Sequence, residues 1–183
     1  MIALDILLII TAVLIAVSLI FSTVKLGISP MPSSSKAYKA IQALVDETGT
    51  EAIIDLGSGW GNLVIPLAQH RPQRQVIGYE LSWLPWLIST LLKKALRLEN
   101  LTLHRANFLH AKLPAASVLI CYLYPEAMVK IAAKLQREQP DINFLISNNF
   151  ALPASKPDKT ISLNDFYKSP IYLYKLNDLE SAR

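Results

Sequence analysis

A glycine-rich segment, Ile53-Ile-Asp-Leu-Gly-Ser-Gly-Trp-Gly-Asn62, carries the clearest chemical signal in the sequence. It follows a short apolar run typical of a strand and precedes a pattern typical of a helix, the position in which a Gly-rich turn binds a cofactor. Gly57, Gly59 and Gly61 permit a tight turn and a close approach of the ligand to the backbone. Their spacing is Gly-x-Gly-x-Gly, whereas the dinucleotide fingerprint is Gly-x-Gly-x-x-Gly. This difference disfavours a nicotinamide dehydrogenase.

Two carboxylates accompany this loop. Asp55 stands two residues before the first glycine, where it disfavours a phosphate and favours a ligand that bears an ammonium or sulfonium group. Glu80 ends the next predicted strand, about 20 residues past the glycines, the spacing at which a carboxylate accepts hydrogen bonds from ribose hydroxyls. A cationic, adenosine-bearing cofactor without phosphate fits both acids, so we expect S-adenosylmethionine (SAM). The alternative is a turn that serves packing only.

The elements that must position these residues alternate along the chain. The predicted strands are Ala52–Asp55, Gln75–Glu80, Leu101–Arg105, Ser117–Tyr122 and Asn143–Ser147, and the predicted helices are Lys36–Thr48, Asn62–His70, Trp83–Leu98 and Pro125 to about Arg137, with Ser33–Ser35 and Ser82 as caps. This alternation predicts an α/β fold, a Rossmann-like doubly wound sheet that is mostly parallel. Thr160–Leu163 and Ile171–Lys175 have no helix between them, which predicts a C-terminal antiparallel hairpin.

An uncharged apolar run from Ile6 to Val24 precedes this domain. As a helix it spans about 28 Å, close to the hydrocarbon thickness of about 30 Å. A signal peptide needs a basic start and a small-residue cleavage site, and a mitochondrial presequence needs arginines and no acid. Here Asp5 precedes the run and the first arginine is Arg71, while a core helix with no polar face would be unusual in so small a domain. We therefore expect one transmembrane helix in the lipid bilayer.

The charges after this run predict its orientation. Lys25, Lys36 and Lys39 follow the run closely, so the positive-inside rule predicts a single-pass membrane protein whose globular part is cytoplasmic. The predicted organisation is an anchor over 1–26, a Pro/Ser-rich linker over 27–35, a catalytic domain over 36–176 and a tail over 177–183.

The remaining charges exclude several kinds of partner. The net charge is +4 and the basic residues are spread along the chain, so we expect no nucleic acid, whereas lysines near the membrane suit anionic lipid headgroups. His70, His104 and His110 lack a neighbouring cluster with metal-ligand spacing, so we expect no metal. Cys121 is the single cysteine and lies in an apolar run, so we expect a buried side chain without a disulfide.

From about Ser33 to Leu176 the chain resembles the class I, seven-strand SAM-dependent methyltransferases. The resemblance implies strand order 3-2-1-4-5-7-6 with the last strand antiparallel. It also implies that the glycine loop and the acid after the second strand bind SAM, that is, Asp55, Gly57, Ser58, Gly59, Gly61 and Glu80.

Within that class the chain resembles a subgroup of small methyltransferases with one N-terminal hydrophobic segment. Its eukaryotic members methylate lysines of the mitochondrial adenine nucleotide translocase and the ATP synthase c subunit. The likeness rests on the apolar run and on Asp55-Leu-Gly-Ser-Gly59, Gly78-Tyr-Glu-Leu81 and Tyr122-Leu-Tyr-Pro125. Those relatives usually have Asp-Gly-Arg at positions 60–62 and an acid at Asn107, where the adenine amino group is held, and an Asn oxygen can accept that bond. The resemblance implies a lysine acceptor on a membrane-associated protein.

The end of the fourth strand is where an acceptor would meet the methyl group. Tyr122 and Tyr124 are two residues apart and are expected to share a face. An aromatic pocket favours a neutral lysine amine, and a tyrosine oxygen can orient its lone pair, so we expect both tyrosines to be catalytic. The alternative is ordinary packing, in which case the wall of the active site is expected at Asn148–Pro153. The strand lacks an Asp/Asn-Pro-Pro-Tyr run, which disfavours a planar amide or a base amine as acceptor.

Three aromatic residues could cover the adenine. Phe108 follows Asn107, and Trp83 and Trp86 follow Glu80, although aromatic residues at the start of an amphipathic helix often belong to the core. Two other functions also fit the sequence: methylation of a lipid or lipophilic small molecule, and non-catalytic SAM binding at a membrane.

Overall fold

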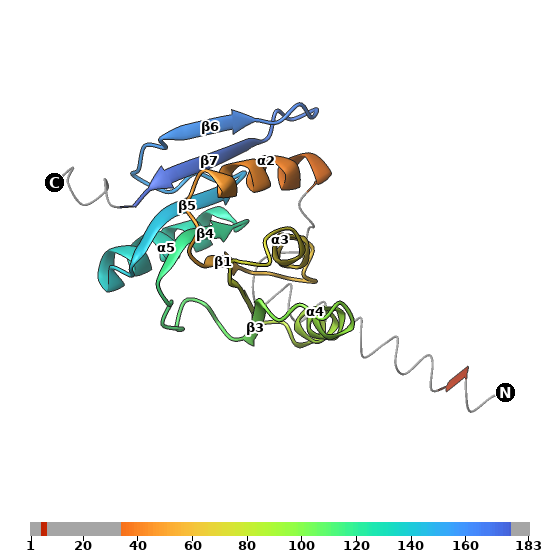
Figure 1. Ribbon diagram of the computed structural model, residues 1–183. Coiled ribbons are helices and arrows are strands. Elements are labelled where there is room, and N and C mark those ends of the chain that lie inside the picture. Colours follow the sequence, from red (N-terminus) through yellow and green to blue (C-terminus); the bar gives the residue numbers. More distant parts are fainter. Residues whose placement is uncertain (1–4, 7–33, 177–183) are drawn as a thin grey trace.

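The computed structural model describes residues 5–6 and 34–176 (Figure 1). Nearly all of the predicted transmembrane run, most of the linker and the tail lie outside these residues. Within the part of the chain that the structure describes, no helix is long and apolar enough to cross a bilayer.

Seven strands form one sheet in the order β3-β2-β1-β4-β5-β7-β6. The elements are α2 (Ser35–Asp46), β1 (Ile53–Leu56), α3 (Val64–His70), β2 (Val76–Glu80), α4 (Trp83–Ala95), β3 (Leu101–Arg105), β4 (Ala116–Cys121), α5 (Pro125–Glu138), β5 (Ile142–Asn148), β6 (Lys159–Ser162) and β7 (Pro170–Lys175). The strand order implied by the resemblance and every predicted strand and helix within these residues are confirmed, with ends that shift by a few residues.

Strands β1 to β5 pair in parallel, whereas β7 pairs antiparallel with both β5 and β6. The predicted antiparallel hairpin is therefore confirmed. Because β6 and β5 are each antiparallel to β7, β6 runs in the same direction as the five parallel strands. The turn between β6 and β7 consequently lies at the edge of the sheet where the parallel strands have their carboxyl ends.

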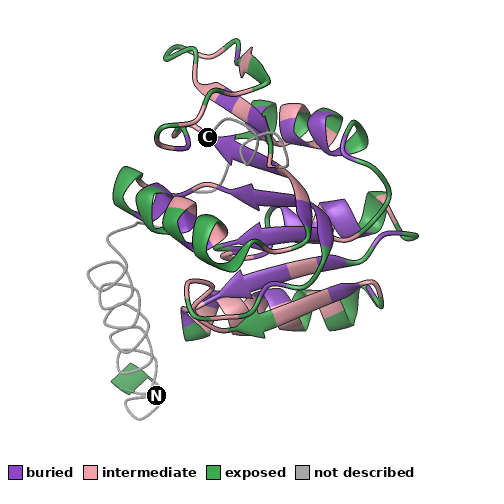
Figure 2. Cartoon of the chain, turned by 90° about the vertical axis from the view of Figure 1, so that its left-hand side faces the viewer, coloured by how far each residue is buried: buried purple, intermediate pink, exposed green. Residues whose placement is uncertain are grey.

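Alternating side chains along the strands supply two cores, one on each face of the sheet. Ile53 of β1 and Val118 of β4 point toward α2 and α3, whereas Ile54 and Leu119 point toward α5. Helices therefore lie on both sides of the buried sheet, as Figure 2 shows. This is the period-2 burial expected of a doubly wound sheet.

Two predicted helix caps have different outcomes. The Ser34 hydroxyl accepts a hydrogen bond from the Ala37 N–H at 3.1 Å, so capping within Ser33–Ser35 is confirmed. Ser82 occupies the cap position of α4, but its side chain makes no capping hydrogen bond, so that prediction is wrong in its mechanism. The turn before α4 is instead fixed by Glu80, whose Oε1 accepts a hydrogen bond from the Ser82 N–H at 2.7 Å.

Candidate active site

The glycine loop is hydrogen-bonded to the end of β2. The N–H groups of Gly57 and Ser58 both donate to the Tyr79 carbonyl at 2.9 Å. The Gly59 N–H donates to Oε2 of Glu80, also at 2.9 Å. The loop and the second acid, 21 residues apart in sequence, thus form one site at the carboxyl ends of β1 and β2.

The three glycines of the loop have positive φ angles, +86° at Gly57, +54° at Gly59 and +85° at Gly61, but different surroundings. A Cβ at Gly59 would approach only the Gly57 carbonyl oxygen, at 3.9 Å, so this backbone is open to a ligand. A Cβ at Gly61 would lie 2.7 Å from Cδ1 of Ile65 and 3.1 Å from Cβ of Ser89. Gly61 therefore lets the loop pack against α3 and α4, whereas Gly59 leaves room for a cofactor.

Both predicted acids are buried close together: Asp55 is 5% exposed and Glu80 is 8% exposed. Burial, and second the charge of Glu80, raise the pKa of Asp55 to about 7. Among residues 34–176 neither carboxylate forms an ion pair. Two buried acids without a counter-ion favour a cationic ligand, because desolvated negative charge is costly unless it is paired.

Ser58 supplies a polar group within the same loop. Its hydroxyl is buried and has no hydrogen-bond partner in the described part of the chain. It packs over Gly78 of β2, where a Cβ would lie 2.8 Å from the Ser58 oxygen. A buried polar atom without a partner is uncommon in a folded protein, so its position beside Asp55 and Glu80 favours a polar ligand there.

Asn107 follows β3 and lies in a turn beside Glu80. The Ala106 N–H donates to the Glu80 backbone carbonyl at 3.1 Å, while Oδ1 of Asn107 accepts from the Leu109 N–H at 3.0 Å. The amide oxygen expected for adenine is thus already used once and has one remaining lone pair. Phe108 is partly buried and packs against the core on the α5 face.

The two tyrosines lie beyond strand β4 rather than within it. The strand ends at Cys121, where the pairing with β1 also ends, because β1 turns away at Gly57. The predicted strand end at Tyr122 is therefore one residue too long, while burial over residues 122–124 still alternates, with Leu123 buried and both tyrosines half-buried. The Tyr122 ring stacks on Phe150 with centroids 6.4 Å apart, and Tyr124 precedes the first residue of α5. Neither hydroxyl has a hydrogen-bond partner among residues 34–176, so both remain available to a substrate.

Comparison with protein families identifies the chain. The model of the ANTKMT methyltransferase domain matches residues 55–159, more than half of the sequence. The chain belongs to the ANTKMT methyltransferase family. The protein is accordingly a methyltransferase, and its methyl donor is S-adenosylmethionine. Comparison with curated proteins gives no match.

Solved methyltransferases share the fold. An RNA methyltransferase from Salinibacter ruber, in complex with S-adenosylhomocysteine, has a TM-score of 0.69 at 21% identity over 80% of this chain and 94% of its own. TrmK from M. capricolum has a TM-score of 0.60 at 12% identity, over 80% and 70% of the two chains. Magnesium protoporphyrin IX methyltransferase from Synechocystis PCC 6803, with bound SAM, has a TM-score of 0.57 at 21% identity, over 74% and 76%. At these identities the likeness establishes the fold alone.

The structure places two further residues of this ANTKMT-family chain beside the tyrosines and the loop, residues to which the sequence assigned no individual role. Phe150 reaches Tyr122 from the segment after β5, and the Ser147 hydroxyl donates to the Phe150 carbonyl at 2.5 Å. Leu123 points toward the glycine loop, with Cδ2 3.6 Å from the position of a Gly57 Cβ. Phe150 lies within Asn148–Pro153, the segment predicted as the alternative wall of the active site. Its stacking on Tyr122 therefore brings the two predicted walls into contact.

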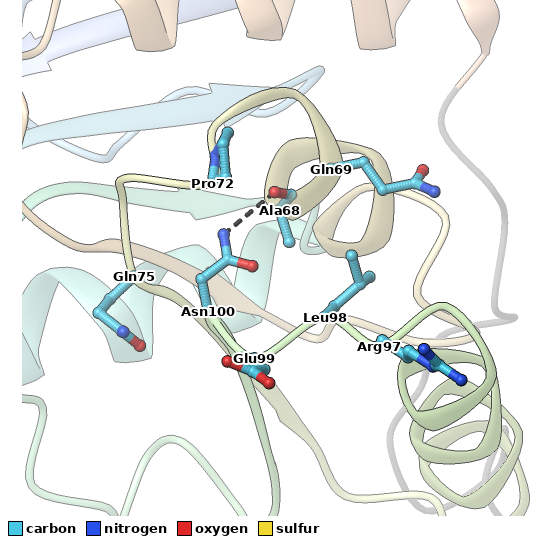
Figure 3. Close-up of a pocket in the computed structure, with 8 residues that line it drawn as sticks. All are labelled: Ala68, Gln69, Pro72, Gln75, Arg97, Leu98, Glu99 and Asn100. Atoms are coloured by element: carbon cyan, nitrogen blue, oxygen red, sulfur yellow. Dashed lines mark hydrogen bonds between the residues drawn. The ribbon is translucent and has the colours of Figure 1, made fainter.

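The opposite edge of the sheet contains a hollow of about 440 Å³, which Figure 3 shows in close-up. It is lined by the C-terminal end of α3 and by the loops that follow α3 and α4: Ala68, Gln69, Pro72, Gln75, Arg97, Leu98, Glu99 and Asn100. The Asn100 side-chain amide donates to the carbonyls of Ala68, Arg71 and Arg74. These bonds join the turns before β2 and β3, and the hollow lies away from the glycine loop.

The sequence also contains candidate metal ligands, one thiol and two tryptophans whose positions the structure gives. Among the residues described, no group of three or more His, Cys, Asp and Glu side chains could hold a metal ion. Cys121 is fully buried beside the Met128 sulfur, as predicted, and burial raises the pKa of its thiol to about 12. Trp83 is half exposed, whereas the Trp86 indole donates to the Leu103 carbonyl at 3.2 Å.

Proposed function

We propose that this methyltransferase is anchored to a membrane by residues 6–24 and transfers a methyl group to a lysine of a membrane-associated protein. The observation that carries the proposal is the ANTKMT-family match over residues 55–159. It is supported by the uncharged apolar run before the domain and by the three lysines that follow this run, which favour a cytoplasmic domain.

The acids and the loop would hold the cofactor. SAM supplies a methyl group bound to a sulfonium, which an acceptor amine takes in an in-line displacement. Glu80 would accept hydrogen bonds from the ribose hydroxyls, because each carboxylate oxygen keeps a lone pair beyond the one used by a backbone N–H. Asp55 would face the ammonium group, and Ser58 would offer its hydroxyl to the same ligand.

The aromatic residues after β4 would receive the acceptor. A free lysine has a pKa near 10.4, so its amine must lose a proton to water before it can attack the methyl group. The half-buried rings of Tyr122 and Phe150 favour the uncharged amine, and the Tyr124 hydroxyl would orient its lone pair. The roles of these residues follow from their position beside the glycine loop, to which Leu123 is adjacent.

The substrate class can be tested with methyl-labelled SAM. The full-length protein is incubated with labelled SAM and membranes, and the label is located by fractionation and by mass spectrometry of lysine-containing peptides. We expect label on protein lysines that disappears with a Glu80→Ala variant. Label in lipid would favour a lipid or lipophilic substrate instead. Label in RNA would contradict both the lysine and the lipid substrate. SAM binding without methyl transfer would indicate a non-catalytic protein.

The anchor can be tested by deletion. Removal of residues 1–27 should release the protein from membranes and leave SAM affinity unchanged, because the buried core and the site lie within residues 34–176. Membrane fractionation and calorimetry measure the two effects. An unfolded truncated protein would mean that the apolar run belongs to the core, and a truncated protein that stays on membranes would mean that it is not the anchor.

A further inference from the structure

The turn between β6 and β7 presents two aromatic rings to solvent. In this turn, residues 163–169, Phe166 is 93% exposed and Tyr167 is 85% exposed, and the two rings meet edge to face with centroids 5.3 Å apart. Every other large hydrophobic side chain in the described residues is at most 55% exposed. Two adjacent aromatic rings that are exposed to solvent to this extent indicate an interaction surface.

The position of this hairpin tip follows from the strand directions. Because β6 runs parallel to β1–β5, the tip lies at the carboxyl-end edge of the sheet, the same edge as the glycine loop. Helix α2 precedes β1 and begins at this edge, so its first turn lies beside the tip in Figure 1. The Lys36 ammonium group donates to the Asn164 carbonyl and joins the two elements.

This edge is also where the chain that follows the apolar run enters the domain. Ten residues, from Lys25 to Ser34, separate Val24 from the first residue of α2. Fully extended, they reach at most about 35 Å. A bilayer that held residues 6–24 would therefore lie within that distance of the start of α2 and of the hairpin tip.

The charges around the rings favour an anionic lipid surface. Lys36 and Lys168 flank the rings and are exposed. The one acid of the turn, Asp165, accepts a hydrogen bond from the Ser169 N–H at 2.9 Å, and this bond lowers the pKa of its carboxyl group. Aromatic rings beside lysines are typical of protein surfaces at the membrane–water interface.

We propose that Phe166 and Tyr167 insert into the headgroup region of an anionic bilayer, so that the edge that carries the cofactor loop faces the membrane. The proposal rests on the membrane anchor proposed above. In this arrangement the hairpin tip and the anchor contact the membrane at two places and together fix the orientation of the domain. A methyl acceptor must then present its amine close to the membrane surface.

The test uses single-cysteine labelling of the full chain in vesicles that contain anionic lipid. Tyr167→Cys carries an environment-sensitive fluorophore at the tip, and Phe166→Cys serves as a second variant. Cys121 does not compete, because it is fully buried and its thiol pKa is about 12. The matched control is Glu99→Cys, an exposed position before β3 at the opposite edge of the sheet.

We expect the emission at position 167 to shift to the blue when vesicles are added and to be quenched by lipid-borne nitroxides, with no change at position 99. If the protein sediments with the vesicles but the label at 167 stays in water, the hairpin proposal is wrong and the anchor stands. If the protein does not sediment with them, both proposals fail. Equal emission shifts at positions 99 and 167 would contradict the proposed orientation. A shift that occurs without vesicles and grows with protein concentration would mean that the tip binds a second copy of the chain instead.

Discussion

A buried polar side chain at each edge of the sheet differs in how many hydrogen bonds its own chain provides. At the amino-end edge, the buried Arg74 guanidinium donates to the carbonyls of Val45 and Glu51 and to the Ser117 hydroxyl, at 2.5–3.1 Å. At the carboxyl-end edge, Asp55 has no ion-pair partner within residues 34–176, and the Ser58 hydroxyl has no hydrogen-bond partner there.

We expect this contrast to separate structural polar groups from ligand-binding ones. A buried polar group whose bonds are all made by its own chain stabilises the fold and leaves nothing for a ligand. A buried carboxylate without a counter-ion destabilises the ligand-free protein, because its charge is desolvated and unpaired. Binding of a cationic ligand can offset this cost. Arg71 at the amino-end edge is intermediate. Its Nε and Nη2 donate to Asp46 and Nη2 also donates to the Gln42 carbonyl, whereas its Nη1 has no hydrogen-bond partner in the described part of the chain.

The largest effect on stability is expected at the amino-end edge. Arg74→Ala removes three hydrogen bonds of a buried guanidinium, while the Val45 carbonyl still accepts from Thr48 and the Ser117 hydroxyl still bonds the carbonyls of Glu51 and Ala52. At about 1.5–3 kcal/mol for each lost hydrogen bond of a charged group, and with partial relaxation, the free energy of unfolding should fall by about 3–5 kcal/mol. Chemical denaturation followed by circular dichroism measures this loss. The fraction that remains folded should bind SAM normally, and weakened binding at unchanged stability would contradict the division between the edges.

The next largest effect is expected on transfer. Tyr124→Phe keeps the ring and removes one oxygen, so the packing against the α5 face should persist. If that oxygen orients the acceptor amine, turnover should fall about 10²-fold while SAM affinity stays constant. Tyr122→Phe is the matched control, because its ring can remain stacked on Phe150. Normal turnover in both variants would make the tyrosines structural.

A smaller effect is expected on cofactor affinity. Glu80→Ala should weaken SAM binding roughly 10- to 150-fold, the range for loss of hydrogen bonds to a charged group. Since Glu80 also holds the N–H groups of Gly59 and Ser82, Glu80→Gln is the informative comparison, because its amide oxygen can still accept one of these bonds. Calorimetry measures both affinities. Glu99→Ala at the other edge is the control, and unchanged affinity in Glu80→Ala would remove Glu80 from the site.

The sequence predicted the fold and the glycine-rich turn after β1 because both depend on local patterns. Apolar periodicity marks each strand and helix, and three glycines beside Asp55 mark the turn. The end of β4 was misplaced by one residue because it depends on where its neighbour β1 turns away. The end of β4 is set by its pairing with β1, so it cannot be predicted from the sequence of β4 alone.

The interactions that the sequence missed join segments that are distant in the chain. The Tyr122–Phe150 stack links loops 28 residues apart, and the acceptors of Arg74 come from three separate segments. The packing role of Gly61 depends on Ser89 of another helix. Such contacts follow from the tertiary packing of elements, which no local pattern encodes.

The smallest predicted effect is a pH dependence of SAM affinity that Asp55 creates. Burial, and second the charge of Glu80, raise its pKa to about 7, so the ligand-free protein holds a proton on Asp55 below that pH. A cationic ligand needs the carboxylate, so affinity should increase up to about tenfold from pH 6 to a plateau above pH 7. Asp55→Asn should bind weakly and lose this dependence.

The same pKa predicts the opposite trend for the stability of the ligand-free protein. The folded-state pKa of about 7 exceeds the ordinary value of 3.8, so between these values the folded state binds more protons than the unfolded state. Stability should therefore decrease as pH rises from about 4 to 7, and Asp55→Asn should remove this decrease. Calorimetric titration with SAM and denaturation without it, both across this range, test the two trends together. A wild-type protein whose affinity and stability are both flat with pH would show that Asp55 keeps an ordinary pKa, and the contrast between the two edges would then rest on the Ser58 hydroxyl alone.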